Sequence, residues 1–348
     1  MNKRSIPKRN YLFVVLFGTL GTVLLMTSLS SSQEVFAANL EWDGGGDGTK
    51  WSDCKNWSAD DCPNNADDIT IAGSEVVLDV DFAIGAGGSL TIEFGSVLVI
   101  DASIMTNQGT IHNNGGIGNF GTIDNQGGTI NNFGGIGNIG TINNKGTINI
   151  NPGGSINNDS IINNDGMIND SGSIGNIGTI NNKGTININP GGSINNDGMI
   201  NNEGGTISNF GGIFNNGTIN NNGTINNNGG ISNTGIIDNK CGGIFNDNGI
   251  ILGSAVAHEP CVAEVGTIID DIYEMNLPNG VQNSLISPLK QARDLLDDKN
   301  PGNDKAACGK LTAFISIVNS KESRHQLTSD KAIDLRELAT QVKADLGC

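Results

Sequence analysis

Residues 140–150 read Gly-Thr-Ile-Asn-Asn-Lys-Gly-Thr-Ile-Asn-Ile, and variants of this phrase fill the chain from Ile111 to Ile250. Within that stretch an isoleucine anchor recurs at nearly constant steps of six residues. Longer steps occur at Gly127-Gly128, Gly204-Gly205, Gly242-Gly243 and the Asn-Pro-Gly-Gly turns at Pro152 and Pro190. The block 137–159 is repeated identically as 175–197, which indicates duplication within the gene. A fixed short period is the sequence signature of a solenoid.

A period of six suits strands rather than helices. Six is a multiple of the two-residue repeat of a strand and a poor multiple of 3.6. A glycine inside a helix also costs roughly 1 kcal/mol relative to alanine. We therefore expect the isoleucine of each Gly-Thr-Ile-Asn-Asn phrase to point inward, and the flanking threonine and asparagine to point outward. The glycine and the second asparagine are expected near bends, where a positive φ is cheap for glycine and tolerable for asparagine.

Stacked coils about 4.8 Å apart would bury a continuous isoleucine column and pair every backbone group with the next coil. With three sides per coil, the twenty-three anchors predict about seven or eight coils. The predicted fold class is mainly β, a parallel β-solenoid whose handedness the spacing leaves open. The spacing resembles that of hexapeptide-repeat left-handed β-helices, and the phrase resembles the Gly-Thr-Ile-x-Asn tracts of large secreted adhesins. Hexapeptide acyltransferases add a catalytic histidine, but this region has only His112, so that activity does not carry over.

The first residues have the pattern of an export signal. Four basic residues precede the apolar run 11–26, and the polar run 30–37 ends in Val-Phe-Ala. This pattern predicts a signal peptide, residues 1–37, cleaved after Ala37. The alternative is an uncleaved anchor, because the apolar run approaches the lower limit for spanning a bilayer. Either way, the predicted location is secreted or on the cell surface.

All six cysteines follow the predicted cleavage point. An even number of cysteines in an exported chain implies disulfides. Fifteen pairings are possible, and the grouping of the cysteines favours Cys54–Cys62, Cys241–Cys261 and Cys308–Cys348. Metal binding by cysteine is the weaker interpretation, since no CxxC occurs and the histidines are scattered.

Residues 38–73 hold all three tryptophans, Trp42, Trp51 and Trp57. The Trp-Ser, Asn-Trp, Pro and Asp-Asp-Ile-Thr-Ile elements of this segment resemble a module near the N-terminus of repetitive bacterial and archaeal surface proteins. We expect the tryptophans to cap the open end of the solenoid, whose exposed strand edges would otherwise pair with other chains. Glycan binding by the tryptophan cluster is the alternative.

Two further sets of candidate residues are weaker. Carboxylates of the cap could supply oxygen ligands to calcium, although their spacing is not that of an EF-hand and solvated turn carboxylates are the simpler interpretation. The strongest of them are Asp43, Asp47, Asp53, Asp67 and Asp68. Glycosylation sequons occur at Asn56, Asn158, Asn169, Asn216 and Asn222.

The solenoid is expected to occupy residues 74–260, with the regular six-residue repeats at 109–251. Alternating apolar residues predict strands at 75–80, 89–94 and 96–101 before those repeats begin. Asparagine dominates the expected outer face, where stacked side chains can form hydrogen-bonded ladders. The threonines before the anchors could form outward rows that bind ordered water or a repetitive glycan, although plain solvation is the simpler interpretation.

Residues 261–348 change to helical patterning. Helices are expected at 268–275, 281–296, 305–318 and from Ser329-Asp330, which can cap the last helix, to Leu346. The order of Leu285, Leu289, Ala292 and Leu295, then Leu-Thr-Ala-Phe-Ile at 311–315 and Leu-Thr-Ser-Asp-Lys-Ala at 327–332, resembles the FIMAH domain. That resemblance implies an accessory or attachment role on a secreted prokaryotic protein and no reaction.

These features predict a non-catalytic, exported structural or adhesive protein. The formal net charge of −17 argues against a nucleic-acid partner, because phosphate binding needs clustered lysine and arginine. The expected partner is an envelope component, a surface glycan or a protein, with membrane contact only through an uncleaved N-terminus. No catalytic set or cofactor is expected, apart from the calcium candidates. The alternative is a secreted β-helix that binds or cleaves polysaccharide, since two carboxylates suffice for glycoside hydrolysis.

Overall fold

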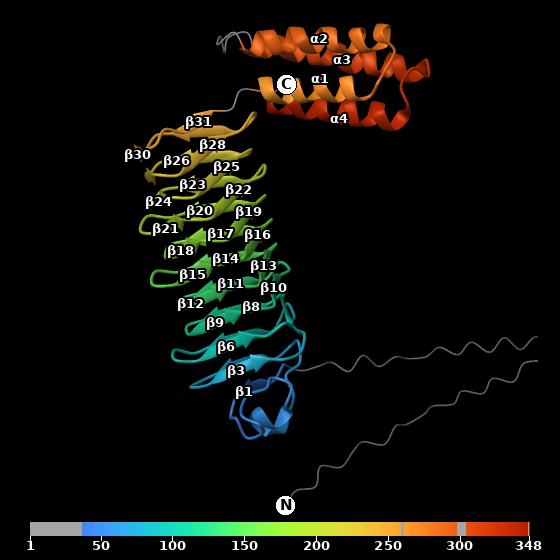
Figure 1. Ribbon diagram of the computed structural model, residues 1–348. Helices are drawn as coiled ribbons and strands as arrows, with labels where there is room; N and C mark the ends of the chain where they lie inside the picture. Colours follow the sequence, from blue (N-terminus) through green and yellow to red (C-terminus); the bar gives the residue numbers. More distant parts are fainter. Residues whose placement is uncertain (1–36, 259–260, 298–303, 347) are drawn as a thin grey trace, which may run out of the picture. The chain divides into compact units, whose positions relative to one another are not determined.

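The computed structural model describes residues 37–258, 261–297, 304–346 and 348. Residues 39–258 of the described chain form a parallel β-solenoid, and four helices follow it (Figure 1). The predicted export signal, apart from Ala37, lies outside the described residues. No helix within these ranges combines the length and the apolarity that a bilayer crossing requires.

Each coil contributes one strand to each of three parallel sheets, so neighbouring strands in a sheet are three apart in the chain, except for the first pair of sheet 1. Sheet 1 contains β1 (Asn39–Glu41), β2 (Asp68–Ile71), β5 (Ser89–Ile92), β8 (Thr110–Asn113), β11 (Thr129–Asn132), β14 (Thr147–Ile150), β17 (Met167–Asp170), β20 (Thr185–Ile188), β23 (Thr206–Asn209), β26 (Thr224–Asn227) and β29 (Ile244–Asp247).

Sheet 2 follows sheet 1 around each coil. It contains β3 (Glu75–Leu78), β6 (Val97–Ile100), β9 (Gly116–Asn119), β12 (Gly135–Asn138), β15 (Ser155–Asn158), β18 (Ser173–Asn176), β21 (Ser193–Asn196), β24 (Gly212–Asn215), β27 (Gly230–Asn233) and β30 (Ile250–Gly253).

Sheet 3 completes the coil. It contains β4 (Phe82–Ile84), β7 (Ile104–Asn107), β10 (Thr122–Asn125), β13 (Thr141–Asn144), β16 (Ile161–Asn164), β19 (Thr179–Asn182), β22 (Met199–Asn202), β25 (Thr218–Asn221), β28 (Ile236–Asn239) and β31 (Ala257–His258). The described strands make about ten coils, because strands before and after the regular repeats continue the stack.

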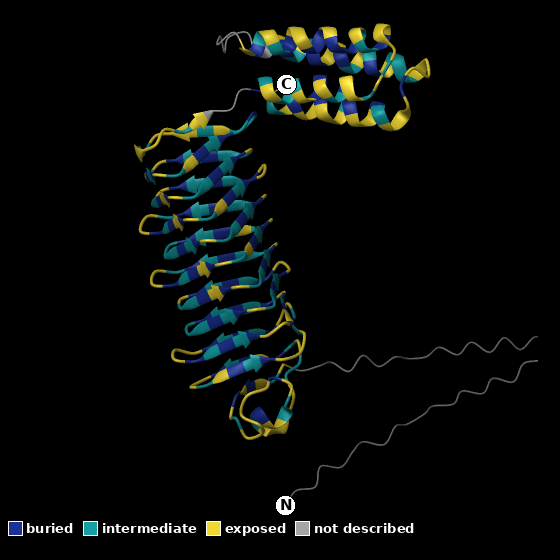
Figure 2. Ribbon diagram, in the orientation of Figure 1, coloured by how far each residue is buried: buried dark blue, intermediate teal, exposed yellow. Residues whose placement is uncertain are grey.

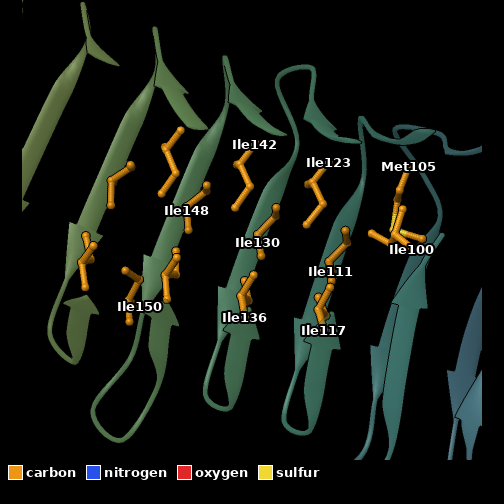
Figure 3. Close-up of a cluster of buried hydrophobic side chains, with 14 of the residues drawn as sticks. Ile100, Met105, Ile111, Ile117, Ile123, Ile130, Ile136, Ile142, Ile148 and Ile150 are labelled. Carbon is orange, nitrogen blue, oxygen red and sulfur yellow. The ribbon is translucent and has the colours of Figure 1, made fainter. Parts of the chain in front are cut away.

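The isoleucine anchors form the core, as the period predicts. Paired strands keep anchor beside anchor, for example Ile123 beside Ile142 and Ile142 beside Ile162. These side chains point into the coil from all three sheets and stack from one coil to the next (Figure 3). The last two anchors, Ile244 and Ile250, are exceptions: they face outward, and Phe245 and Ile251 pack against the core in their place. Almost every anchor is fully buried, which Figure 2 shows as dark bands within each coil. Burial of one isoleucine contributes about 1.5–3 kcal/mol, so the column supplies the main stabilising term.

The expected position of the second asparagine, near a bend with a tolerated positive φ, is wrong: it is the inward-facing last residue of the strand. In strands such as β13 (Thr-Ile-Asn-Asn), Thr141 and Asn143 face outward, while Ile142 and Asn144 are buried. A strand alternates its faces with a strict period of two, so the residue two places after an inward isoleucine must also point inward. None of these asparagines has a positive φ within the described chain.

Buried asparagines form hydrogen-bonded ladders along the axis. Under sheet 3, each Nδ2 donates to the Oδ1 in the next coil, at 2.6–2.8 Å, from Asn107 to Asn239. A second ladder under sheet 2 runs from Asn119 to Asn233. The second Nδ2 hydrogen donates to a backbone carbonyl, as from Asn119 to the oxygen of Thr141 at 3.0 Å. Beyond the first asparagine of each column, the buried amides are thereby satisfied, which burial of a polar group requires.

The ladders begin where isoleucine gives way to asparagine. The Oδ1 atoms of Asn107, Asn113 and Asn119 are buried and accept no hydrogen bond in the described chain. Each is the first asparagine of its column, so no amide in the preceding coil donates to it. The interior therefore changes along the axis, from an aliphatic start to a mixed isoleucine and asparagine core.

Most corner glycines are required for space and not for a positive φ, which corrects the expectation from the sequence. A Cβ added to Gly140 would lie 2.1 Å from the carbonyl oxygen of Gly121, the equivalent corner of the preceding coil. Positive φ occurs instead at the longer steps, as at Gly127 (92°) and Gly153 (91°). Extra residues are thus absorbed at corners, and the strands on either side stay in register.

The duplicated block fits this geometry. Its repeat is offset by 38 residues, from 137–159 to 175–197, and the same offset separates β12 from β18 in sheet 2. Two coils lie between equivalent residues, so the duplication adds whole coils and returns every residue to the same sheet and corner.

The C-terminal helices are α1 (Val262–Glu274), α2 (Asn279–Asp297), α3 (Asp304–Ser323) and α4 (Ser329–Asp345). They share one apolar core that includes Leu285, Leu289, Phe314 and Leu335. One detail differs from the sequence expectation: Thr328, and not Ser329-Asp330, is the N-cap of α4, without a side-chain capping bond.

Candidate functional site

The tryptophans at the start of the solenoid form a closed cluster. Trp57 stands edge-on to Trp42 and Trp51, with ring centroids 5.0 and 4.8 Å apart, and its Nε1 donates to the oxygen of Trp51 at 2.9 Å. The three side chains are 6, 2 and 0 % exposed for Trp42, Trp51 and Trp57. Rings this deeply buried present no face to a sugar, so the glycan-binding interpretation of the cluster is wrong. The burial fits the capping role.

Aspartate side chains stabilise the turns of the same N-terminal segment by accepting hydrogen bonds. Asp47 accepts hydrogen bonds from the backbone N–H groups of Lys50 and Thr49 and from Nδ2 of Asn56. These bonds, led by that of Lys50, hold the pKa of Asp47 at about 2. Asp53 accepts from the N–H groups of Asp47 and Lys55. The carboxylates therefore act as acceptors that fix the turns around η1 (Cys54–Asn56) and η2 (Ser58–Asp60).

The remaining calcium candidates are also engaged in hydrogen bonds. Asp43 accepts from the N–H of Gly45, Asp67 from the N–H groups of Ala38 and Asn64, and Asp68 from the hydroxyl of Ser89. Across the described ranges, no three His, Cys, Asp or Glu side chains come together as a potential metal-ligand group. His112 lies in β8, His258 in β31 and His325 before α4, in three separate segments.

The structure contains the three disulfides Cys54–Cys62, Cys241–Cys261 and Cys308–Cys348. They are the pairs that the grouping of cysteines favours. The first closes the turns of the tryptophan cap, and the second joins the corner after β28 to the N-cap of α1. The third joins α3 to the last residue of the chain. Each bridge restricts the unfolded chain at one end of a structural unit.

The five sequons differ in access. Asn56 and Asn158 are fully buried, and their amides are used in the cap and in the sheet 2 ladder. Asn169 is half-buried in an outer row. Asn216 and Asn222 are exposed at corners. Only the last two could carry a glycan without disturbing the folded interior.

The first asparagine of each phrase forms a second, outer set of ladders. On sheet 3, Asn163, Asn181, Asn201 and Asn220 each donate from Nδ2 to the preceding coil at 2.9–3.0 Å. On sheet 1, Asn149, Asn169 and Asn187 do the same. An amide has two N–H donors and two acceptor positions, so each rung keeps one donor and one acceptor for solvent or a ligand.

The expected outward threonine rows are interrupted. On sheet 1, Thr110, Thr129 and Thr147 are adjacent, and Met167 follows them before Thr185, Thr206 and Thr224 continue the row. On sheet 3, Ile161 and Met199 break the row formed by Thr122, Thr141, Thr179 and Thr218. The flat polar faces are therefore defined by asparagine more than by threonine.

Asp170 is a buried carboxyl in an interrupted inner column under sheet 1. Its neighbours along the axis are Ile150 and Ile188, so it has no amide partner in either adjacent coil. Oδ1 accepts from the N–H of Gly172 at 3.0 Å, and Oδ2 has no partner in the described structure. Burial raises the pKa of Asp170 to about 6, although the backbone N–H groups of Gly172 and Ser193 act in the opposite direction. Sequence reasoning missed this position because it reads as one more polar residue of the repeat.

Sheet 2 presents a different surface. Its outward positions are mostly glycine and serine, and a shallow hollow of about 670 Å³ lies over β21, β24, β27 and β30. Phe210, Phe214, Ile250 and Leu252 line it, and all four side chains are about half exposed or more. This is an apolar patch of the kind that marks contact surfaces.

No protein-family model, no curated protein sequence and no solved structure matches this chain. The likeness to adhesin tracts and to the FIMAH domain therefore rests on the quoted residues alone. The observed features are a parallel β-solenoid, a tryptophan cap, four C-terminal helices and three disulfides.

Proposed function

We propose that the protein is an exported structural or adhesive surface protein, in which the β-solenoid is a rigid spacer and the helical module attaches to an envelope component or another partner. The observation that carries this proposal is the unbroken register of about ten coils around an isoleucine core. Each coil contacts its neighbours through three sheets and through axial amide ladders, so bending requires breaking several sets of bonds together. A stack of this kind holds its two ends at a fixed separation.

Two further features support export. Disulfides persist in oxidising environments outside the cytoplasm, and all six cysteines are paired. The basic, apolar and small-residue pattern of residues 1–37 predicts a route across the membrane.

The test is fractionation of the native cells followed by intact-mass analysis of the protein. We expect a surface or released protein that begins at Ala38 and has lost six hydrogens to three disulfides. A retained N-terminus would make it a membrane-tethered rod and would keep the spacer role. A cytoplasmic protein with six free thiols would refute the proposal.

A polysaccharide-binding protein is the second candidate, and the outer asparagine ladders favour it. Their rungs present one fixed donor and one fixed acceptor per coil, which suits a chain of hydroxyl groups lying along the axis. The test is co-sedimentation of the mature protein with insoluble polysaccharides. Saturable binding that is lost in Asn163→Ala/Asn181→Ala would establish this function, and equal binding by that variant would exclude the sheet 3 ladder as the site.

A further inference from the structure

The edge of the solenoid between sheet 3 and sheet 1 carries a row of alternating charges. Lys145, Asp165, Lys183 and Glu203 occupy this corner in four consecutive coils, and all four side chains are exposed. We call these four residues the charged edge. Because coils stack about 4.8 Å apart, the row extends along the axis for roughly 14 Å.

The other two edges are different. The only cations of residues 109–251 are Lys145, Lys183 and Lys240, and all three lie at the sheet 3 to sheet 1 corner. The corners between sheets 1 and 2 hold residues such as Phe133, Phe210 and the two Asn-Pro turns. Those between sheets 2 and 3 hold Phe120, Ile139, Asp159, Ile177, Asp197, Asn216 and Thr234. Within the regular repeats, positive charge is thus confined to one line along the solenoid.

The charged edge borders a polar groove on sheet 3. The groove has a volume of about 460 Å³, and the outer amides of Asn143, Asn163 and Asn181 line it together with the four charged side chains. These amides are held in the outer ladder, so the floor of the groove is rigid while the charged side chains reach out beyond it.

Contacts within the chain use little of this charge. One salt bridge joins two members of the charged edge, Lys183 to Glu203 at 3.7 Å, and both side chains are more than half exposed. Exposed pairs of this kind contribute little to stability. Lys145 and Asp165 make no salt bridge in the described structure. The alternation is therefore not accounted for by pairing inside one rod.

We propose that the charged edge and its groove are the interface of an antiparallel dimer, with a second copy of this chain as the partner. A two-fold axis between Asp165 and Lys183 places each member of the row opposite a member of opposite sign. Lys145 then faces Glu203 of the other copy, and Asp165 faces its Lys183. Each pair occurs twice, which gives four complementary contacts in a closed, isologous interface.

The surroundings of the row are also compatible with this axis. Beyond the four charges, Gln126 of one copy faces Asn222 of the other, so amides meet amides. On the groove floor, Asn143 faces Asn201, and Asn163 faces Asn181. No like charges oppose each other among these positions. The whole chain carries −17, which repels a second copy at long range. At about 0.1 M salt the Debye length is about 10 Å, so the distant charges are screened while the close pairs persist.

Other arrangements of two rods fit less well. A parallel pair in register would set lysine against lysine and carboxylate against carboxylate. A parallel pair shifted by one coil would match opposite charges, but it leaves an open end that continues to add copies. The antiparallel pair is the one that both matches all four charges and closes.

The test is sedimentation equilibrium of the full mature protein and of charge-reversal variants. At about 0.1 M salt we expect a concentration-dependent dimer of the native protein, with its Kd raised at least about tenfold at 1 M salt. Lys145→Glu and Glu203→Lys should each be monomeric over the same range, because each creates two like-charge contacts across the axis.

Two combinations separate the dimer from a role within one chain. The double variant Lys145→Glu/Glu203→Lys restores every contact across the axis, although it places like charges side by side along its own edge, so it should dimerise. An equimolar mixture of the two single variants should form a heterodimer for the same reason. Asp159→Lys, which changes the charge by the same amount at another corner, should dimerise like the native protein. Circular dichroism establishes that each variant is folded.

Three results would overturn the proposal. The first is a native protein that stays monomeric up to about 0.5 mM at both salt concentrations, where even weak specific pairs associate. The second is dimerisation of Lys145→Glu with unchanged Kd. The third is a folded double variant that remains monomeric, because that outcome would mean that the alternation serves contacts along one edge.

Discussion

Sheet 3 carries two asparagine ladders that differ in little except the side on which they lie. Asn144, Asn164 and Asn182 point inward and are linked at 2.7 Å, whereas Asn143, Asn163 and Asn181 point outward and are linked at 2.9–3.0 Å. The inner amides are essentially inaccessible, and the outer ones are partly exposed. Similar hydrogen bonds therefore occur in two environments, the protein interior and the hydrated surface.

The comparison shows that the contribution of such a hydrogen bond to stability depends on whether water can replace it when it breaks. A broken outer rung is replaced by water at little cost. A broken inner rung leaves a buried N–H and a buried Oδ1 unpaired, although Nδ2 keeps its bond to a backbone carbonyl. An unsatisfied buried polar group costs about 1–3 kcal/mol. The inner ladder consequently fixes the coil register and disfavours slippage, while the outer ladder chiefly orders the surface.

The largest effect is expected at a corner glycine, where neighbouring coils approach each other most closely. Gly140→Ala should destabilise the protein by about 4 kcal/mol or prevent folding, because its Cβ would overlap the carbonyl of Gly121 in the neighbouring coil. Gly137→Ala, three residues earlier on the outer face of sheet 2, meets nothing within 4 Å and should be neutral or slightly stabilising. Urea unfolding followed by circular dichroism measures both. Equal effects of the two changes would contradict the close stacking of corners.

A smaller loss is expected from the inner ladder itself. Asn164→Ala removes two rungs, from Asn144 to Asn164 and from Asn164 to Asn182. One N–H of Asn144 loses its partner, while its bond to the oxygen of Met167 remains, and Oδ1 of Asn182 loses the amide that donates to it. We expect a loss of about 3 kcal/mol in the free energy of unfolding. Asn163→Ala is the matched control, and its change should lie within about 0.5 kcal/mol. If the two variants unfold at the same urea concentration, the ladders have no different energetic roles.

The third effect concerns Asp170, the inward-facing residue under sheet 1 that has no amide partner in either adjacent coil. The folded-state pKa of Asp170 is about 6 against an ordinary 3.8. The folded protein therefore binds a proton more tightly than the unfolded chain, and the stability of the native protein should rise as the pH falls from about 7 to 4. The shift sets an upper limit of about 3 kcal/mol on the penalty above pH 6.

Asp170→Asn should remove most of that penalty. We expect a gain of about 2 kcal/mol at pH 8 that disappears by pH 4. The asparagine would occupy the place in the coil that Asn132 holds two coils earlier, where Nδ2 donates to the oxygen of Ser155 at 2.9 Å. Unfolding of both proteins across this pH range is the measurement. A gain that does not vary with pH would show that Asp170 is not the group that titrates.

The sequence is sufficient to predict the solenoid, because a six-residue period with an aliphatic anchor has few other solutions. It also indicates the strands at 75–78, 89–92 and 97–100, the four helices and the capping position of the tryptophans. These features depend on periodicity and composition, which are local properties of the chain.

The inner asparagines could not be assigned as readily, since asparagine is usually a surface residue and the phrase Ile-Asn-Asn does not say which of the two is enclosed. Strict alternation from Ile142 would have placed Asn144 inside. The glycines misled for a related reason: a residue with no side chain suits both a positive φ and a close approach. The isolation of Asp170 and the charged edge depend on which residues meet one coil apart, about 18–20 residues away, and a single strand does not show this.

The duplication at an offset of 38 residues has a consequence for how this protein can change in size. Because one copy equals two whole coils, each further copy would lengthen the rod by roughly 10 Å and leave every existing contact in place. The same offset relates Lys145 to Lys183 and Asp165 to Glu203. Every added copy would therefore bring one cation and one anion to the charged edge, and a row with any even number of alternating charges remains its own complement. One kind of mutation, duplication of two coils, would then increase both the length of the solenoid and the number of charge pairs in the proposed dimer.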